Sequence, residues 1–201
     1  YQCLYILIDS CSIFFKGLSM GYSPDDRTLV TLINKQSISD LVCRYSRGVD
    51  RQDFALLRTL FTREGVDDHG DLYRGSAAGY IDCLEQVMAN CDITSHAVHN
   101  HLIAMVDDNT AEGEVYVSAY HRIRDDKGVL LDYVGGFRYL DLYRIEEGAW
   151  RFARRQLIID WCKTEPAFWN VDDPWLPGTP IGAVGLDDPS YALTHPLFAK
   201  N

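Results

Sequence analysis

Apolar residues recur at helical spacing in the stretch from residue 37 to residue 62. In its first half they stand three or four positions apart, at Ile38, Leu41, Val42, Tyr45 and Val49. This spacing places them on one face of an α-helix. Ser37, with Asp40 three residues later, has the form of a capping box, so we predict that this helix begins at Ser37. Gly48 is suited to end it.

Two further amphipathic runs follow. The first has Phe54, Leu57, Leu60 and Phe61 on one side, and the second has Tyr80, Ile81, Leu84, Val87 and Met88. We therefore predict a second helix after residue 53 and a third over residues 77–90. The connection 48–53 is short enough to be a tight elbow, in which Asp53 can cap the second helix. Asp50, in the same elbow, has no evident structural task beyond an Asx turn.

The period of the pattern changes to two at Ile93. Four long alternating segments follow, HAVHNHLIAMV, EVYVSAYHRIR, LLDYVGGFRYLDLYRI and WRFARRQLIIDWC, with turn residues between them. Because the strands follow the helices rather than alternate with them, the predicted class is α+β. Gly135 and Gly136, in the third segment, favour a bulge or bend. We predict one curved antiparallel sheet over 93–161, a cone with the N-terminal helices packed in its concavity, and a short interrupted strand over 66–75.

The two ends of the chain lack such patterns. Residues 1–19 hold an apolar run that is interrupted by an aspartate and is too short to span a bilayer. We expect residues 1–19 to be an extension outside the fold, residues 20–162 to be one α+β domain, and residues 163–201 to be an irregular arm. The arm carries several large aromatic residues, so we expect it to pack on its own sheet or on a neighbouring subunit.

Composition narrows the classes of function. With 201 residues, 47% of them hydrophobic and 12% aromatic, the chain can bury a core and line an apolar pocket. Its net charge of −10 argues against nucleic-acid binding, which relies on lysine and arginine.

The six cysteines form no CxxC pair and fit free thiols in a reducing compartment, so we expect a cytoplasmic protein. No GxSxG, P-loop or dinucleotide fingerprint is present, and we expect no cofactor and no membrane association.

Three histidines, His96, His99 and His101, stand at the start of the first long strand. An HxH pair can begin a metal site, but the glutamate that such a signature needs a few residues later is replaced by Met105 and Val106. Strand alternation also turns His96 away from the other two histidines. We therefore predict no metal site.

Polar residues on apolar strand faces are the remaining candidates. Alternation places His96 and Asn100 on one such face and His121 at the end of another. In the last strand, Arg155 shares a face with Trp161, and an arginine there needs a carboxylate, a carbonyl or a ligand. Each residue has a plain structural alternative: a satisfied core histidine, a hydrogen bond to a strand neighbour, or a half-solvated strand end.

The segments DLVCRYSRGVDRQDFALLRTLFT, TSHAVHNHLI, EVYVSAYHRI and GGFRYLDLYRIEEGAWRFARRQLIIDW occur in this order. Together they resemble the SnoaL-like branch of the nuclear transport factor 2-like superfamily over residues 34–161, and the DDPSY of residues 187–191 resembles it as well. The resemblance implies an α+β cone with a deep pocket, in agreement with the pattern above. It also implies a homo-oligomer, and we expect a dimer or trimer built through the convex face of the sheet.

Members of this superfamily include scytalone dehydratase, bile acid 7α-dehydratase and hexachlorocyclohexane dehydrochlorinase, which use an Asp–His pair as the base of an elimination. The resemblance carries these two roles onto Asp50, in the VD that follows the first helix, and onto His96, in TSH. It implies that Tyr45 and Arg155 assist catalysis. His121 stands where scytalone dehydratase has a second histidine.

We therefore hypothesise a cofactor-independent lyase, a dehydratase acting on a cyclic apolar small molecule such as a steroid, terpenoid or polyketide. Asn100, His121 and Trp161 are predicted to bind this substrate. Other members of the superfamily are cyclases, isomerases or non-catalytic subunits, so a polyketide-type cyclase or isomerase, or a binding or assembly module, remains an alternative. An open cavity of several hundred cubic ångströms would favour a ligand site.

Overall fold

A computed structural model describes residues 25–167 and 177–193 of the chain. The chain divides into two compact units after Ile33, and the second unit, from Asn34 onward, carries the sheet and the candidate site. The expected extension of residues 1–19 lies outside the described residues. No helix in the described ranges is long and apolar enough to cross a membrane.

Helix α2 (Asp26–Asp50) is longer than the hydrophobic pattern indicates. The predicted start at Ser37 is wrong, because the helix is capped at Asp25, whose carboxylate accepts a hydrogen bond of 2.7 Å from the backbone N–H of Thr28. Ser37 and its apparent capping box therefore lie inside the helix. Only the part from Ile38 onward buries its apolar face, which is why the periodic signal begins there.

Gly48 lies within α2 rather than at its end, where it allows close packing of the next helix. A Cβ atom at Gly48 would lie 2.7 Å from Cδ2 of Leu57 in α3 (Phe54–Leu60). Asp53 caps α3 as predicted, accepting a backbone hydrogen bond of 2.9 Å. The connection is the expected tight elbow, and it leaves Asp50 in the last turn of α2.

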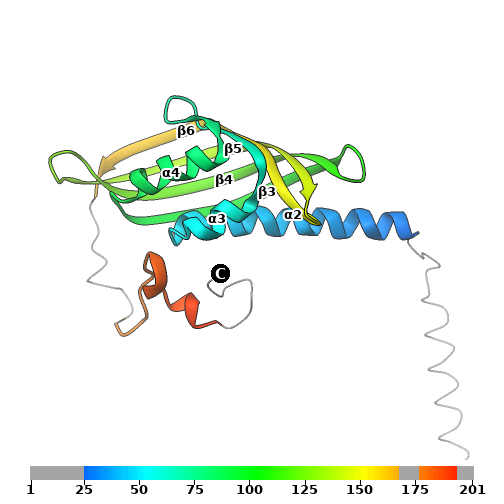
Figure 1. Ribbon diagram of the computed structural model, residues 1–201. Helices are drawn as coiled ribbons and strands as arrows, with labels where there is room; N and C mark the ends of the chain where they lie inside the picture. The colour runs from blue at the N-terminus through cyan, green and yellow to red at the C-terminus, as the bar shows by residue number, and fades with distance from the viewer. Residues whose placement is uncertain (1–24, 168–176, 194–201) are drawn as a thin grey trace, which may run out of the picture. The chain divides into compact units, whose positions relative to one another are not determined.

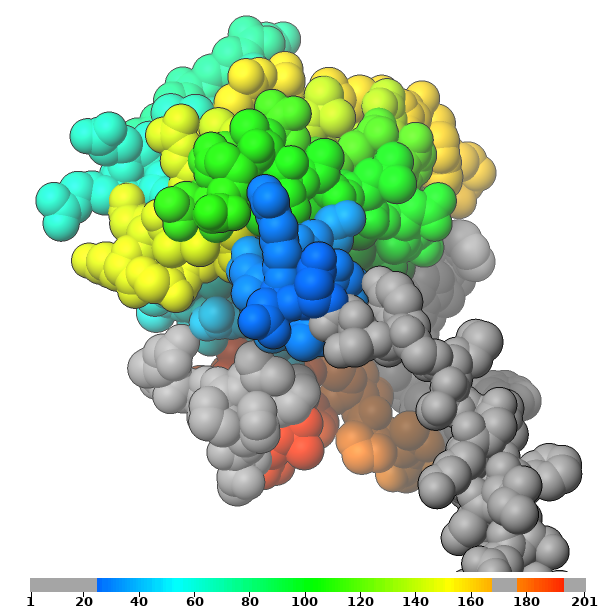
Figure 2. Space-filling view, turned by 90° about the vertical axis from the view of Figure 1, so that its right-hand side faces the viewer, coloured from blue at the N-terminus to red at the C-terminus, as the bar shows by residue number. Residues whose placement is uncertain are grey.

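Six strands form one curved sheet in the order β2-β1-β6-β5-β4-β3 (Figure 1). Their bounds are β1 (Phe61–Asp68), β2 (Arg74–Ser76), β3 (Cys91–Met105), β4 (Thr110–Arg124), β5 (Leu130–Glu146) and β6 (Ala149–Pro166), with α4 (Ala77–Met88) between β2 and β3. The four long strands are antiparallel neighbours, as predicted. In the space-filling view their residues form one continuous region, coloured green to orange-yellow (Figure 2). β1 joins β6 in parallel. The predicted α+β class is confirmed.

A bulge lies at the predicted glycine pair 135–136. The pairing of β5 with β6 passes from Gly136–Trp161 to Phe137–Ile159, so β6 carries one extra residue at this point. A Cβ atom at Gly136 would lie 2.3 Å from Nε1 of Trp161, which explains why a residue without a side chain stands there. The bulge also turns Trp161 to the opposite face of the sheet from Ile159.

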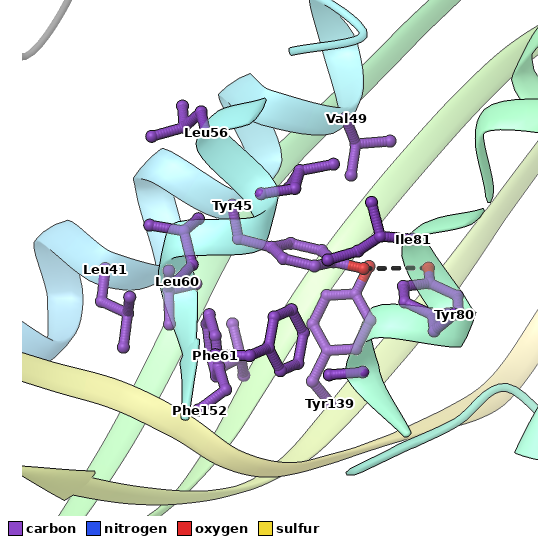
Figure 3. Close-up of a cluster of buried hydrophobic side chains, with 14 of the residues drawn as sticks. Leu41, Tyr45, Val49, Leu56, Leu60, Phe61, Tyr80, Ile81, Tyr139 and Phe152 are labelled. Carbon is purple, nitrogen blue, oxygen red and sulfur yellow. Dashed lines mark hydrogen bonds between the residues drawn. The ribbon is translucent and has the colours of Figure 1, made fainter. Parts of the chain in front are cut away.

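The helices pack on the sheet through an aromatic cluster (Figure 3). The ring of Tyr45 in α2 makes edge contacts with Phe61, Tyr139 and Phe152, at centroid distances of 6.2, 5.9 and 5.7 Å. All four residues are less than a tenth exposed, and edge-to-face geometry is a favourable arrangement of aromatic pairs. The predicted packing of the helices against one face of the sheet is confirmed.

The described part of the C-terminal arm holds two short 3₁₀ helices, η1 (Gly185–Asp187) and η2 (Pro189–Ala192). We expected an irregular arm from residue 163 that packs on the sheet or on a neighbouring subunit. Residues 163–166 instead continue strand β6, and the contacts of the described residues 177–193 are with α2 and the elbow after it. The backbone N–H of Gly185 donates to the carbonyl of Arg51 at 2.8 Å. The Asp188 carboxylate and the Arg51 guanidinium form an ion pair at 3.4 Å.

Candidate functional site

A cavity of about 310 Å³ lies between the helices and the sheet. Most of its wall is apolar, and its polar groups are three histidines and four tyrosines: His69, His96, His121, Tyr45, Tyr80, Tyr133 and Tyr139. This volume falls at the lower end of the range for small-molecule sites. The cavity therefore suits a small, largely apolar ligand that carries a few polar atoms.

Asp50 and His96 meet at the wall of this cavity, although they are 46 residues apart in the chain. The Asp50 Oδ1 atom lies 2.6 Å from Nδ1 of His96, and its Oδ2 atom accepts a hydrogen bond of 3.0 Å from the His96 backbone N–H. One carboxylate thus holds both the ring and the backbone of the same residue. The side chains are 12% and 8% exposed, and Nε2 of His96 is the ring nitrogen that Asp50 does not use.

The elements explain this geometry. The last turn of α2 carries Asp50 toward the sheet, and the elbow stops the helix at that point. His96 lies on β3 opposite Ala119 of β4, a small residue that leaves room for an imidazole. A carboxylate bonded to Nδ1 favours the tautomer with a proton there and a free lone pair on Nε2. This arrangement makes Nε2 a base that can accept a proton from a ligand.

His121 lies beside this pair. Its ring centroid is 5.1 Å from that of His96, and its Nδ1 atom is 2.9 Å from Oγ1 of Thr94. The pKa of His121 is lowered to about 4, and burial is the main cause. The nearby His96 adds to this shift, and the Asp50 carboxylate opposes it. His121 is therefore neutral at pH 7 and can exchange hydrogen bonds with a ligand without adding charge.

Tyr45 also reaches the cavity, with its hydroxyl 3.0 Å from that of Tyr80 in α4 (dashed line in Figure 3). Burial raises the pKa of both hydroxyls well above the usual value for tyrosine. Both therefore remain protonated at neutral pH and can act as hydrogen-bond donors.

A second Asp–His pair, which sequence reasoning missed, lies on the same cavity. Nδ1 of His69 contacts Oδ1 of the fully buried Asp67, and Nε2 of His69 is 3.1 Å from the Tyr80 hydroxyl. The sequence reads DDHG at this point, which we took for a loop within a short strand. The available signal was a histidine two residues from an aspartate, a spacing that places both on one face of a strand.

Arg155 does not line the cavity, so the geometry does not support its predicted catalytic role. It is fully buried and makes two hydrogen bonds to the Asp141 carboxylate, of 2.9 and 2.7 Å. Its guanidinium carbon lies 4.0–4.1 Å from the ring centroids of Tyr45, Tyr139 and Phe152. The carboxylate that the sequence required is thus supplied by the neighbouring strand, and the cation is enclosed by aromatic rings.

Two predicted substrate-binding residues point away from the cavity. A bulge in β3 between Val98 and His101 adds one residue relative to β4. It places Asn100 on the exposed face and brings His101 to the inner one, reversing the strand alternation that we assumed. Trp161 is 56% exposed because the bulge in β6 turns it outward in the same way.

The described residues contain no cluster of three or more potential metal ligands. His99 and His101 have separate partners: Nε2 of His99 is 2.8 Å from the Ser118 hydroxyl, and Nε2 of His101 is 3.1 Å from the Tyr143 hydroxyl. The HxH sequence therefore does not form a chelating pair.

Helices that close one face of a curved, mostly antiparallel sheet over a cavity define the nuclear transport factor 2-like class of proteins. A family model, the SnoaL-like domain, matches residues 30–156, and the chain belongs to this family. A search of curated proteins found no match.

Solved structures with the same fold cover most of the chain. A candidate scytalone dehydratase from Novosphingobium aromaticivorans is 21% identical, with a TM-score of 0.61 over 80% of this chain and 97% of that one. The type 2 hexachlorocyclohexane dehydrochlorinase LinA is 18% identical, with a TM-score of 0.64 over 75% and 99%. The type 3 enzyme from Novosphingobium barchaimii is 17% identical, with a TM-score of 0.63 over 71% and 97%. These similarities establish the fold.

Proposed function

We propose that the protein is a cofactor-independent lyase that acts on a small cyclic molecule, with His96 as the base. One observation carries this proposal: the Asp50 carboxylate holds His96 at both Nδ1 and the backbone N–H, at 2.6 and 3.0 Å, beside an apolar cavity. A histidine held only for packing would not need its ring and its backbone fixed by the same buried carboxylate.

The chemistry follows from the hydrogen bonds. Nε2 of His96 removes a proton from a carbon next to a carbonyl group, and the Asp50 carboxylate stabilises the imidazolium that forms. The hydroxyl of Tyr45 donates a hydrogen bond to the carbonyl oxygen as negative charge develops on it. Loss of a hydroxyl group from the adjacent carbon then completes a dehydration, for which His96 returns the proton.

Two further points support this function. Hexachlorocyclohexane dehydrochlorinase and the candidate scytalone dehydratase, both named for eliminations, have the same fold. The cavity of about 310 Å³ also has the size of a ligand site, which favours a ligand-binding protein over an assembly module whose interior is filled by core side chains.

Exchange of α-protons for deuterium on a bicyclic ketone tests the base without knowledge of the natural substrate. We expect the protein to accelerate exchange of the α-protons of 1-tetralone in D₂O, followed by NMR. His96→Ala should abolish the acceleration. Asp50→Asn should reduce it steeply, since the same change in a serine protease triad lowers turnover about 10⁴-fold through the wrong histidine tautomer.

Matched controls lie close in the chain. His99→Ala changes a histidine of the same strand on its exposed face, and Asp40→Asn changes an exposed aspartate of the same helix. Both controls should exchange at the wild-type rate. Equal exchange by the wild type and His96→Ala would refute the assignment of the base.

A further inference from the structure

Four residues outside the Asp50–His96 pair form a continuous hydrogen-bonded chain, and three of them, His69, Tyr80 and Tyr45, line the cavity. The chain runs from Asp67 to Nδ1 of His69, from Nε2 of His69 to the Tyr80 hydroxyl at 3.1 Å, and from there to the Tyr45 hydroxyl at 3.0 Å. We infer that this chain is a proton relay that protonates a carbonyl oxygen of the ligand through Tyr45. The inference rests on the proposed function for the reaction that uses the proton.

The direction of the hydrogen bonds depends on the charge of His69. When His69 is an imidazolium, Nδ1–H donates to Asp67 and Nε2–H donates to Tyr80. Tyr80 then donates to Tyr45, and the Tyr45 proton is left for the ligand. When His69 is neutral, its remaining proton stays on Nδ1 beside Asp67, and Nε2 accepts from Tyr80. Tyr80 can then accept the Tyr45 proton, which competes with the ligand.

The surroundings hold the ring of His69 in place and favour the neutral form of the two tyrosines. The side chain of Asp67 is fully buried, so its attraction to an imidazolium is little screened by solvent. The rings of His69 and Tyr80 are stacked at a centroid distance of 4.4 Å, which fixes their relative orientation. Because both tyrosines have a raised pKa, each can pass a proton on while remaining a hydroxyl.

Asp67 itself retains hydrogen-bonding capacity. Its Oδ2 atom and the Nη1 atom of Arg155 are both buried and have no hydrogen-bond partner within the described part of the chain. The two residues are register partners on β1 and β6. The relay therefore ends at a carboxylate that has a buried arginine as its neighbour on the adjoining strand.

The proton balance closes over one reaction. When His96 removes the α-proton, the C–H electron pair becomes the double bond of an enol. The carbonyl oxygen takes the Tyr45 proton, Tyr80 replaces it, and His69 becomes neutral. In the second half, the enol proton returns through Tyr45 and Tyr80 to His69, the carbonyl re-forms and the carbon–oxygen bond to the leaving hydroxyl breaks. His96 gives its proton to that hydroxyl, which leaves as water.

Among the described residues, Tyr139 is a further ionisable group that faces His69. Tyr139 in β5 lies at a centroid distance of 6.3 Å from His69, and burial raises its pKa to about 12. Tyr139 therefore stays neutral over the range in which a histidine titrates. Among the described groups packed around the ring, a pH dependence of the relay then reports on His69 and its partners Asp67 and Tyr80.

Infrared spectroscopy of bound 1-tetralone, labelled with ¹³C at the carbonyl, tests the relay. We expect the carbonyl stretch to fall to lower frequency on binding, and to fall further below the pH at which the His69 ring titrates by ¹⁵N NMR. Tyr45→Phe should remove the shift and weaken binding about 3- to 10-fold, the equivalent of one hydrogen bond. Tyr80→Phe and His69→Gln should keep the shift but remove its pH dependence, a result that a purely structural role would not produce.

Two variants serve as controls. Tyr133→Phe makes the same change on another tyrosine of the cavity wall, and His96→Gln changes another histidine of that wall. Both should retain the pH-dependent shift. The inference fails if the ketone does not bind saturably, if Tyr45→Phe leaves the stretch unchanged, or if Tyr80→Phe and His69→Gln both keep the pH dependence. Deuterium exchange depends on His96 and is scored separately, so loss of the proposed base does not by itself refute the relay.

Discussion

The Asp50–His96 pair and the Asp141–Arg155 pair have the same kinds of side chain but differ in their access to the cavity. Both join a buried carboxylate to a basic side chain from a distant part of the chain. Arg155 is enclosed by Asp141 and three aromatic rings and does not reach the cavity. His96 leaves one ring nitrogen that Asp50 does not use and lines the cavity. The two pairs therefore differ in whether the basic side chain presents an atom to the cavity.

Breaking the core pair gives the largest expected loss of stability. Asp141→Ala leaves the Arg155 guanidinium charged and unpaired in the core, and removal of one partner of a buried ion pair costs about 3–5 kcal/mol. Urea denaturation measures this loss. The double variant Asp141→Leu with Arg155→Met removes both charges and should recover most of it. If Asp141→Ala kept wild-type stability and lost only activity, Arg155 would belong to the site after all.

The sequence predicted most of the fold for identifiable reasons. The period of two over four long segments, separated by short turns, is a strong local signal, and Gly135 and Gly136 marked the bulge correctly. The helix start at Ser37 was wrong because the first turns of α2 carry polar residues and exposed apolar ones, so hydrophobic periodicity does not report them. A capping box within a longer helix looks the same in sequence as one at its start.

Only some of the candidate site residues were placed correctly from the sequence. Asp50, His96, Tyr45 and His121 came together through a family resemblance, since each residue alone had a plain structural explanation. Asn100 and Trp161 were misplaced because one extra residue in a strand reverses the facing of all that follow, and no local pattern marked the bulge in β3.

Arg155 was misassigned for a different reason. Its partner Asp141 is its register neighbour on β5, and register is a property of the paired strands that alternation within one strand does not reveal. Asp67 and His69 were overlooked because only the folded chain brings the Tyr80 hydroxyl to His69.

Acidic pH should lower the stability of the folded protein because of His121, which lines the cavity. Its pKa falls from an ordinary 6.5 to about 4 on folding, so between these pH values the unfolded chain binds a proton that the folded protein does not. The free energy of unfolding should therefore decrease as pH falls through this window, by up to about 3 kcal/mol. Comparison of urea denaturation of the wild type and His121→Gln at pH 7 and pH 4.5 isolates this contribution. Equal pH dependence of the two proteins would show that His121 is not buried in this way.

Removal of the carboxylate at the cavity should cost less stability than removal of the one in the core. Asp50→Ala leaves the backbone N–H and the ring of His96 without their partner, a loss of about 1–3 kcal/mol for an unsatisfied buried group. An imidazole, unlike the guanidinium of Arg155, can exist without a charge, so loss of its partner need not leave a buried charge. Denaturation of Asp50→Ala beside Asp141→Ala measures the difference directly. A larger loss for Asp50→Ala would reverse the comparison.

Substitution of the two residues that face outward should have the smallest effect. Asn100 is exposed on the outer face of β3, and Trp161 is 56% exposed, so neither lines the cavity. Asn100→Ala should change stability by less than about 0.5 kcal/mol, as surface substitutions usually do. Trp161→Ala removes an indole that lies against Gly136, and loss of this contact can change stability. This variant is therefore used to measure ligand affinity alone. Titration of both variants with 1-tetralone should give the wild-type dissociation constant, while Tyr45→Phe weakens it. If Asn100→Ala lost as much affinity as Tyr45→Phe, the Asn100 side chain would face the cavity. The assignment of a bulge between Val98 and His101 would then be wrong.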